Sequence, residues 1–273
     1  AAGALAATYG PGWRTPDPLF QWSIQPAARR AMRAVRVTPG QMSLLQWERH
    51  YARGEAPEDG PSELARFAAA HRNARTVGVI DLGCGDGRDT LTVAGELPAL
   101  GIDGSRAAVE KAERRAGREG VRFARADVGH AKALRALLTP LTARGPVLVY
   151  ARRLLDSVEE ATEVALVRTL RRVLAPGSLV VLEVTTHERE PGPLGTPLHR
   201  AVAPRELVRR WTAGSHLALV TLEHDETAGV ARVVLRRRTA VARRGHALLA
   251  RARRVLRGIA RRARRALGAT SRG

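Results

Sequence analysis

The sequence predicts an α/β fold with a doubly wound, mostly parallel sheet, and three observations support this prediction. Residues 79–90 read Val-Ile-Asp-Leu-Gly-Cys-Gly-Asp-Gly-Arg-Asp-Thr, which is an apolar strand, a glycine-rich turn and the start of a helix. Short apolar strands then alternate with amphipathic helices, the pattern of a parallel sheet covered by helices. The last two predicted strands, 217–224 and 230–237, are joined by a short polar loop and form an antiparallel hairpin.

The other elements follow in chain order, each with a local signal. Ser62 precedes the helical segment 63–72, and its hydroxyl is expected to cap the first turn. Ser105 is expected to cap the helix 105–116, which has Gly117 near its end. Five further strands are expected at 76–82, 99–103, 121–126, 147–150 and 178–184. Four further helices are expected at 88–95, 131–138, 158–174 and 204–213.

Composition divides the 273-residue chain into three regions. Residues 1–45 are expected to be an N-terminal arm or the remnant of an upstream domain, residues 46–237 the α/β domain, and residues 238–273 a basic amphipathic tail. The formal net charge is +20, but 14 arginines and no acid lie from Arg236 onward, which leaves +6 for the rest of the chain. The basic character therefore belongs mainly to the tail.

The tail has apolar residues at helical spacing between Leu248 and Leu267, and arginines fill most of the remaining surface. A basic amphipathic helix can lie on an anionic membrane surface or bind nucleic-acid phosphates. A helix docked on its own domain and a disordered Ala/Arg-rich tail are the structural alternatives. Because no aromatic residues are interleaved, stacking on single-stranded nucleic acid is disfavoured, and nucleic acid is the less favoured partner.

Several classes of protein are disfavoured by composition. Cys84 is the single cysteine, so the chain cannot form an internal disulfide, and no residue cluster predicts a metal site. No apolar run reaches the roughly 18–20 residues that span a bilayer. The arginine-rich, lysine-poor composition indicates a GC-rich bacterial genome. These features favour a cytoplasmic protein, with attachment of the tail to the inner face of the membrane as an extension of that prediction.

The glycine spacing of the turn after the first strand indicates the kind of cofactor. Gly83, Gly85 and Gly87 follow the strand, whereas a dinucleotide-binding fingerprint needs its third glycine at position 88, which is Arg88. Asp81 lies two residues before the first glycine, where a carboxylate would repel a pyrophosphate and suit a cationic cofactor. The turn is therefore expected at the carboxyl end of a parallel strand, the place where open α/β sheets bind nucleotide-like cofactors.

The motif Asp-Leu-Gly-Cys-Gly-Asp-Gly-Arg-Asp resembles that of class I S-adenosylmethionine-dependent methyltransferases, and in particular that of the tellurite-resistance and thiopurine-type small-molecule enzymes. The resemblance extends from about Trp47 to Arg237. It implies a Rossmann-like sheet of seven strands and S-adenosyl-L-methionine as cofactor. Gly83 and Gly85 would let the backbone lie against the methionine part, and Asp81 would favour the ammonium group.

Two further acids at strand ends are candidate cofactor ligands. Asp103 follows the second strand and could accept hydrogen bonds from both ribose hydroxyls, or it could be a turn acid. Asp127 with Val128 resembles the acid and apolar pair that contacts the adenine amino group and ring in the family. A helix cap or turn acid is the alternative for Asp127.

The end of the fourth strand is the expected acceptor edge. Residues 150–157 read Tyr-Ala-Arg-Arg-Leu-Leu-Asp-Ser, where relatives carry a Tyr-Ala-Arg-x-x-Leu-His wording. Asp156 stands near the position of that histidine and is either a base or the cap of the following helix. Tyr150 is a further candidate catalytic residue that lines the methionine side. Arg152 could bind an anionic acceptor group, or form a structural or solvated ion pair.

Three other side chains complete the predicted acceptor site. Trp47 and Tyr51 resemble a Trp-x-x-x-Tyr helix that covers the cofactor in related enzymes, and the alternative is that they pack on the core. His187 is the best histidine candidate for a base because it titrates near neutrality. His199 is a weaker candidate of the same kind.

Residues 9–18, Tyr-Gly-Pro-Gly-Trp-Arg-Thr-Pro-Asp-Pro, resemble the end of the nucleotidyltransferase-like phosphocholine-transferase family. This resemblance implies that the chain is the C-terminal half of a fusion that acts on cell-surface glycans. The alternative is an N-terminal arm that packs on the core.

The predicted function is S-adenosylmethionine-dependent methylation of oxygen or nitrogen in a small molecule or glycan intermediate. An RNA methyltransferase, with the tail supplying affinity, is an alternative. A catalytically silent methyltransferase-like binding module in an envelope-polysaccharide enzyme is another. The chain has no Asp/Asn-Pro-Pro-Tyr/Phe segment, and its cysteine lies in the cofactor turn, so the amino-methylating DNA enzymes of that type and C5-cytosine methylation are disfavoured.

Overall fold

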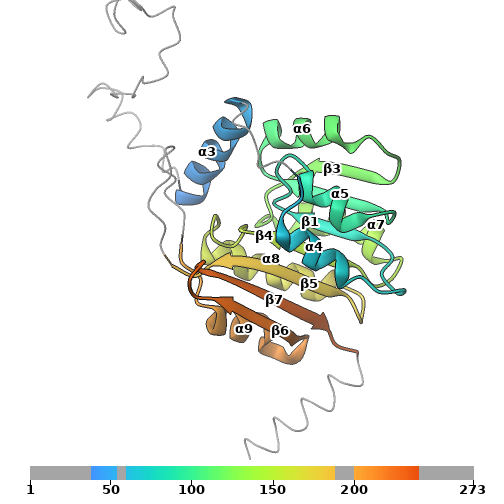
Figure 1. Ribbon diagram of the computed structural model, residues 1–273, viewed down its shortest axis with the longest axis vertical. Coiled ribbons are helices and arrows are strands. Elements are labelled where there is room, and N and C mark those ends of the chain that lie inside the picture. Colours follow the sequence, from blue (N-terminus) through green and yellow to red (C-terminus); the bar gives the residue numbers. More distant parts are fainter. Residues whose placement is uncertain (1–37, 54–59, 188–199, 240–273) are drawn as a thin grey trace, which may run out of the picture. The chain divides into compact units, whose positions relative to one another are not determined.

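The computed structural model describes residues 38–53, 60–187 and 200–239, and Figure 1 shows the arrangement of their helices and strands. The expectations for residues 1–37 and for the tail from residue 240 onward lie outside these ranges, as does His199. The predicted domain boundaries at residues 45 and 237 stay predictions.

Seven strands of the described residues form one sheet in the order β3-β2-β1-β4-β5-β7-β6. The first five strands in this order are parallel to one another, and β7 runs antiparallel to both β5 and β6. The predicted doubly wound sheet with a C-terminal antiparallel hairpin is therefore confirmed. The strands are β1 Val79–Leu82, β2 Ala99–Asp103, β3 Val121–Arg125, β4 Leu148–Arg152, β5 Leu179–Thr185, β6 Leu217–Asp225 and β7 Val230–Arg237.

Helices cover both faces of the sheet (Figure 1). On one face, α4 and α5 bury Leu64 and Val93 against the strands. On the other face, α7, α8 and α9 bury Leu138, Leu166 and Trp211 in a larger apolar cluster. The helices are α3 Pro39–Arg53, α4 Glu63–Ala70, α5 Arg88–Ala94, α6 Arg106–Ala116, α7 Ala131–Thr142, α8 Glu160–Val173 and α9 Pro204–Thr212, followed by a 3₁₀ turn Ala213–Ser215.

Two serine caps predicted from the sequence are confirmed. The Ser62 hydroxyl accepts a hydrogen bond from the Ala65 N–H at 3.1 Å, and the Ser105 hydroxyl accepts one from the Ala108 N–H at 3.0 Å. Each bond satisfies an N–H of the first helical turn that has no helical partner. Gly117 ends α6 with a φ of 57°, the left-handed conformation that glycine adopts readily.

Two helices extend beyond their predicted bounds. The helix expected around Gln46 begins at Pro39, because a proline in the first turn lacks only an N–H that would have no helical partner there. The helix expected to end at Leu138 continues to Thr142 through Pro140. Pro140 lies in the last turn, so its missing N–H costs few hydrogen bonds, and the extension buries Thr142.

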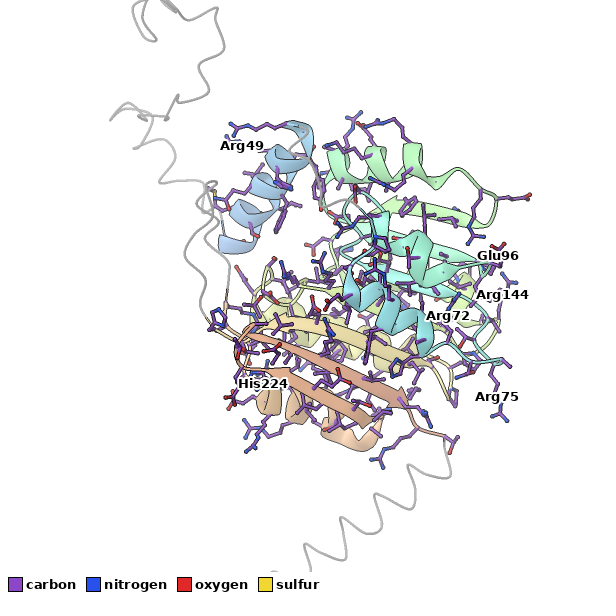
Figure 2. The ribbon with its side chains drawn as sticks, viewed as in Figure 1. Arg49, Arg72, Arg75, Glu96, Arg144 and His224 are labelled. Carbon is purple, nitrogen blue, oxygen red and sulfur yellow. The ribbon has the colours of Figure 1, made fainter. Side chains whose placement is uncertain are left out.

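The carboxyl ends of the parallel strands lie along one edge of the sheet. Figure 2 shows Arg75, Glu96 and Arg144, which precede β1, β2 and β4, at the amino edge, and His224, near the end of β6, at the opposite edge. Strands β2 and β3 are added on one side of β1, and β4 and the later strands on its other side, so the winding of the sheet reverses between β1 and β4. In open α/β sheets, ligands bind beyond the carboxyl ends of the strands at such a switch point.

A buried carboxylate joins α8 to α9 behind the sheet. Glu163 is 1 % exposed and accepts hydrogen bonds from the indole N–H of Trp211 at 3.0 Å and from Nε of Arg210 at 3.0 Å. Arg200 also donates to it. Burial would raise the pKa of Glu163, but the hydrogen bonds from Arg210 and Arg200 outweigh burial and hold the pKa below its ordinary value. The carboxylate therefore stays ionised near neutral pH.

Candidate active site

The loop that follows β1 requires glycine at two positions. Gly83 and Gly85 have φ values of 72° and 54°, in the region that L-residues with side chains rarely adopt. A Cβ at Gly83 would lie 3.1 Å from Cδ1 of Leu154, and a Cβ at Gly85 would overlap the hydroxyl of Tyr51. The loop backbone is therefore approached closely by side chains from two distant segments.

Asp81 lies in β1 just before this loop and is 1 % exposed. Its Oδ2 accepts a hydrogen bond from the Thr90 hydroxyl at 2.6 Å, whereas its buried Oδ1 has no hydrogen-bond partner among the described residues. Burial raises the pKa of Asp81 to about 8, because the hydrogen bond from Thr90 opposes this rise only in part. The site therefore contains a carboxyl group that can accept a hydrogen bond from a ligand.

Asp103, the last residue of β2, connects the glycine loop to the start of α6. Its Oδ2 accepts a hydrogen bond from the N–H of Gly85 at 2.9 Å, and its Oδ1 accepts one from the N–H of Ser105 at 2.8 Å. Burial raises the pKa of Asp103 above its ordinary value, although the backbone hydrogen bonds oppose the rise. Asp103 is thus a turn acid, and because each oxygen has a second lone pair, this role leaves it able to accept ribose hydroxyls.

Glu48 holds α3 against α6 and was not among the residues singled out from the sequence. Its Oε2 accepts a hydrogen bond from the Ser105 hydroxyl at 2.8 Å and faces the N–H of Ala107 at 3.3 Å. Burial would raise the pKa of Glu48, but the bonds from Ser105 and from the first N–H groups of α6 lower it. A carboxylate is favoured at a helix N-terminus, so Glu48 fixes α3 beside the turn of Asp103.

Tyr51 lies on the same helix and extends over the glycine loop at Gly85. Burial and the nearby charge of Asp103 raise the pKa of its phenol, so Tyr51 stays protonated. The ring centroid of Trp47 lies 6.2 Å from that of Tyr51 and 5.5 Å from that of His50. Tyr51 thus contacts the loop, as the covering role of this helix would require, and Trp47 supports it from the same side.

Asp127 follows β3 and forms a turn. Its Oδ1 accepts a hydrogen bond from the N–H of Gly129 at 2.7 Å, and its side chain is exposed. Val128 is 6 % exposed and belongs to the apolar cluster under α7 and α8. The turn role is therefore present, and the contacts with adenine stay predictions.

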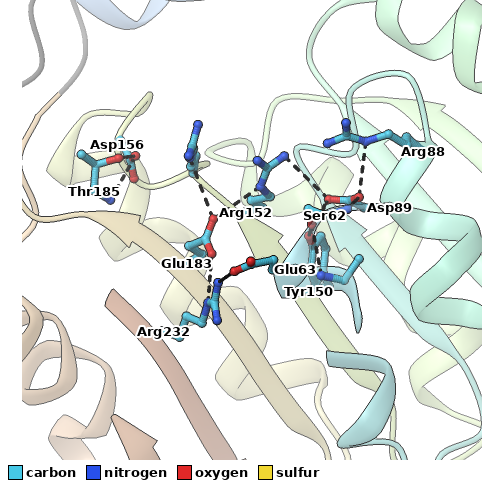
Figure 3. Close-up of polar contacts among 12 residues, drawn as sticks. Ser62, Glu63, Arg88, Asp89, Tyr150, Arg152, Asp156, Glu183, Thr185 and Arg232 are labelled. Carbon is cyan, nitrogen blue, oxygen red and sulfur yellow. Dashed lines mark hydrogen bonds and ion pairs between the residues drawn. The ribbon is translucent and has the colours of Figure 1, made fainter. Parts of the chain in front are cut away.

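Tyr150 on β4 is committed to a buried hydrogen-bond network. Its hydroxyl donates to Oδ2 of Asp89 at 2.7 Å and lies 3.2 Å from the Ser62 hydroxyl, which donates to the same carboxylate at 2.7 Å. Burial and the charge of Asp89 raise the pKa of Tyr150. Figure 3 shows these three side chains meeting beside β4. Tyr150 is therefore placed to stay a phenol rather than to become a phenolate.

The predicted acceptor arginine, Arg152, belongs to an ion-pair network on the same side of the sheet (Figure 3). Its guanidinium lies 3.4 Å from Glu183 and 3.9 Å from Asp89. Glu183 is 5 % exposed and also contacts Arg232 at 3.2 Å, which in turn contacts Glu63 at 2.7 Å. Arg152 thus has the structural ion pairs that the sequence left as an alternative, and its role in acceptor binding stays a prediction.

Asp156 follows β4 and is 1 % exposed. Its Oδ2 accepts hydrogen bonds from the Thr185 hydroxyl at 2.6 Å and the Thr185 N–H at 3.2 Å, and its Oδ1 has no hydrogen-bond partner among the described residues. Burial raises the pKa of Asp156 against these hydrogen bonds. The expectation that Asp156 caps the next helix is wrong, because Glu159 occupies the N-cap position of α8.

His187 follows β5 and is exposed. Its ring lies so close to Gly229, in the turn between β6 and β7, that a Cβ there would overlap it. The neighbouring Thr186 hydroxyl lies 3.2 Å from Nε2 of His224. His187 therefore packs against the terminal hairpin, and its role as a base stays a prediction.

Sequence reasoning missed the acids that organise this edge, which are Asp89, Glu183 and Glu48. Asp89 lies in the first turn of α5, directly after the glycine motif, and that position is the one signal that could have indicated it. Glu183 interrupts the apolar strand β5, where a buried carboxylate requires cationic partners. Apart from Arg88, which lies next to Asp89, their partners are distant in the sequence, so these pairs could not be predicted from spacing.

Within the described ranges, no group of three or more His, Cys, Asp or Glu side chains is arranged to hold a metal ion. The helices of the same ranges include none that is long and apolar enough to cross a membrane.

Residues 79–177, from β1 to the turn before β5, match the protein family described as "Methyltransferase domain". This part of the chain is a methyltransferase domain. Its cofactor is S-adenosylmethionine. A search among curated proteins found no match.

Solved structures of methyltransferases share the fold of this domain. The N-methyltransferase NodS from Bradyrhizobium japonicum, in complex with S-adenosylhomocysteine, is 17% identical with a TM-score of 0.52, covering 71% of this chain and 98% of its own. The 1,6-didemethyltoxoflavin-N1-methyltransferase from Burkholderia thailandensis is 18% identical with a TM-score of 0.54, covering 81% and 94%. A methyltransferase from Anabaena variabilis is 13% identical with a TM-score of 0.58, covering 74% and 96%. At these identities the likeness shows the fold.

The loop residues of the methyltransferase domain fit S-adenosylmethionine. The buried Oδ1 of Asp81 has no hydrogen-bond partner among the described residues, so an ammonium group could donate a hydrogen bond to it. Gly83 and Gly85 present backbone without Cβ atoms, and Asp103 is only half-buried. The individual contacts stay predictions for Asp81, Gly83, Gly85, Asp103, Asp127 and Val128.

Proposed function

We propose that this S-adenosylmethionine-dependent methyltransferase methylates an oxygen or nitrogen atom of a small molecule or a glycan intermediate. Two structures of similar fold support this acceptor class. One is an N-methyltransferase, which supports transfer to nitrogen, and the other contains bound 1,6-didemethyltoxoflavin, which supports a small acceptor. The sequence of the glycine motif resembles that of tellurite-resistance and thiopurine-type enzymes, and this resemblance supports the same acceptor class.

The observation that carries the proposal is the carboxyl group of Asp156. Its buried Oδ1 has no hydrogen-bond partner among the described residues, while Oδ2 is held by Thr185. Transfer to a hydroxyl or protonated amine requires a proton acceptor. A carboxyl whose pKa is raised by burial accepts a proton more readily than an exposed one. Asp156 is therefore the base that we assign, and His187 is the second candidate.

Other residues of the chain would bind and orient the reactants. When bound, S-adenosylmethionine supplies a methyl group already activated by a sulfonium, so positioning and proton removal are left to the protein. Asp81 would hold the ammonium group and Asp103 the ribose hydroxyls. Tyr51 would cover the glycine loop and exclude water, and Tyr150, which stays a phenol, would line the methionine side.

Replacing Asp103 with alanine should weaken binding of S-adenosylmethionine at least tenfold, about 1.4 kcal/mol. The variant loses the acceptors for the ribose hydroxyls and also the bonds from Gly85 and Ser105 that shape the loop. Isothermal titration calorimetry on both proteins measures the difference.

Glu96→Ala removes an exposed acid at the amino edge and serves as the matched control, with unchanged affinity expected. If Asp103→Ala is folded and binds as tightly as the wild type, Asp103 does not bind the ribose. Transfer of a labelled methyl group from the cofactor then tests the acceptor class. Label in low-molecular-mass or glycan fractions of a bacterial extract supports the proposal, and label in RNA alone contradicts it.

Asp156→Asn should lower the rate of methyl transfer to the labelled fraction about a hundredfold, since general base catalysis typically contributes 10²–10⁴-fold. The amide keeps the shape of the side chain and can still accept the bond from Thr185. Affinity for S-adenosylmethionine, measured in parallel, should change less than twofold. A folded Asp156→Asn with full transfer activity would remove Asp156 from the mechanism, and the same assay on His187→Gln would then test the second candidate.

A further inference from the structure

The outer edge of β6 is an exposed strand edge with apolar side chains. β6 is the last strand in the sheet order, so no strand of the described ranges pairs with its second side (Figure 1). The strand contains neither proline nor lysine, two residues that commonly protect such edges. Among the described residues, few large apolar side chains are exposed, and two of them, Leu219 and Val220 at 43% and 45%, are adjacent on this strand. An edge of this kind is a template for pairing with another strand.

The pairing of β6 with β7 shows which residues of β6 share a face. Leu219 is in register with Leu235 and Leu222 with Val233, and these two partners are two residues apart on β7. Because side chains and backbone groups alternate with a period of two along a strand, Leu219 and Leu222 lie on one face and present equivalent backbone groups to the outer edge. Leu219 of one copy can therefore face Leu222 of a second copy in an antiparallel pair.

A β-bulge lies at the centre of this pairing. The register with β7 shifts between Leu219 and Thr221, so Val220 is the extra residue. A two-fold axis beside Val220 leaves the regular stretches 217–219 and 222–224 on either side of it, and each would face the other stretch of the second copy. A register shifted by two residues would place the extra residue of one copy against a regular stretch of the other. The bulge therefore favours one closed, two-fold arrangement.

The charges near the two ends of β6 complement one another in the same pairing. In the register that joins Leu219 to Leu222, Ala218 faces Glu223 of the second copy. Arg236 of β7 is in register with Ala218 on its other side. The Arg236 guanidinium and that carboxylate would then lie on one face, with their backbones two strand spacings or about 10 Å apart, which these long side chains span together.

Both charged side chains are available for this contact. Glu223 and Arg236 are exposed, and neither has an ion-pair partner among the described residues. Arg232, which is opposite Glu223 on β7, is instead paired with Glu63 at 2.7 Å and with Glu183 at 3.2 Å. A two-fold axis would repeat the contact, so that two ion pairs flank the apolar centre.

We propose that β6 pairs with β6 of a second copy of this chain, so that two seven-stranded sheets join across a two-fold axis. Leu219, Val220 and Leu222 would form the apolar centre of the interface, and Arg236 of each copy would pair with Glu223 of the other. Strands β4, β5 and β7 separate β6 from β1 and its glycine loop, so the inference does not depend on the proposed function.

Reversal of the two charges tests the proposal. Sedimentation velocity of the full-length protein over a range of micromolar concentrations, at low ionic strength, should show a dimer. Glu223→Arg and Arg236→Glu should each raise the dissociation constant of the dimer at least tenfold, because each variant replaces two attractions by two repulsions. The double variant restores opposite charges and should return the constant to within about threefold of the wild type.

Glu113→Arg makes the same change of charge at an exposed position on α6, beside the opposite edge strand β3, and should associate as the wild type does. A wild type that stays monomeric overturns the proposal. A dimer that neither reversal weakens, or that the double variant does not restore, is held by another surface and also overturns it.

Alanine variants decide the question if circular dichroism shows that a charge-reversed chain does not fold. Glu223→Ala and Arg236→Ala should each raise the dissociation constant about threefold. Because the two side chains act on each other, the double alanine variant should weaken association no further than either single variant. Independent, additive effects of the two alanines would overturn the pairing.

Discussion

The ratio of wild-type to Asp81→Asn affinity for S-adenosylmethionine is expected to fall about 50-fold from pH 8 to pH 6. The pKa of Asp81 is raised to about 8 by burial, so about half of the free protein carries the carboxylate at pH 8 and about 1% at pH 6. The ammonium group of the ligand prefers the carboxylate to the neutral acid. Binding must therefore remove a proton from Asp81 below pH 8, and the affinity falls as the pH falls.

Calorimetry over this pH range measures both affinities, and buffers with different ionisation enthalpies report the proton released. Asp81→Asn cannot ionise and serves as the reference. Because the amine of the ligand titrates equally in both experiments, the ratio removes its contribution. Release of nearly one proton at pH 7 by the wild type, and none by Asp81→Asn, should accompany the change. A ratio that does not depend on pH would show that Oδ1 of Asp81 does not face the ligand.

The sequence predicted the parts of the fold that depend on local signals. β2 and β7 have their predicted bounds, and Ser62 and Ser105 cap their helices, because a serine before an amphipathic run needs only its own turn to act as a cap. The sequence did not predict that α3 begins at Pro39 or that α7 continues through Pro140 to Thr142. Proline is in fact tolerated in the first turn of a helix and near its end.

The candidate site was predicted less completely, because its geometry depends on long-range contacts. Tyr150 was singled out because it ends the predicted strand 147–150, but its hydroxyl donates to Asp89, 61 residues earlier. Asp156 was predicted to be either a base or a helix cap, and its carboxylate accepts a hydrogen bond from Thr185, 29 residues later. The left-handed backbone of Arg153 had no signal at all, since arginine is not a residue that indicates such a turn. Motif spacing locates the cofactor loop, whereas the acceptor edge forms only when β4, β5 and α5 meet.

The burial of Glu163 likewise could not be predicted from the sequence. It lies among charged and polar residues in the first turn of α8, where an acid is normally an exposed partner of the helix dipole. The structure instead buries it against Arg210, Arg200 and Trp211. This carboxylate holds α9 under the sheet and so supports the hairpin that closes the fold.

Glu163→Ala should lower the free energy of unfolding by about 3 kcal/mol, the size expected when one partner of a buried ion pair is removed. The variant leaves the indole N–H of Trp211 and two guanidinium groups without their acceptor. The guanidinium groups are 22% and 24% exposed, so water compensates them in part, and the loss stays at the lower end of the range. Urea denaturation at pH 7 measures the change through the transition midpoint.

The pH dependence of the free energy of unfolding separates the contribution of the Glu163 charge from that of its packing. Because its folded pKa lies below its unfolded value, the stabilisation is fully present above the unfolded pKa and is lost as the pH falls through the folded pKa. The difference between wild type and Glu163→Ala should therefore shrink below about pH 4. Glu160→Ala, at an exposed position on the same helix, should cost less than about 1 kcal/mol at any pH. If the two variants were equally stable at pH 7, α9 would be held by apolar burial of Trp211 and Leu207 rather than by the carboxylate.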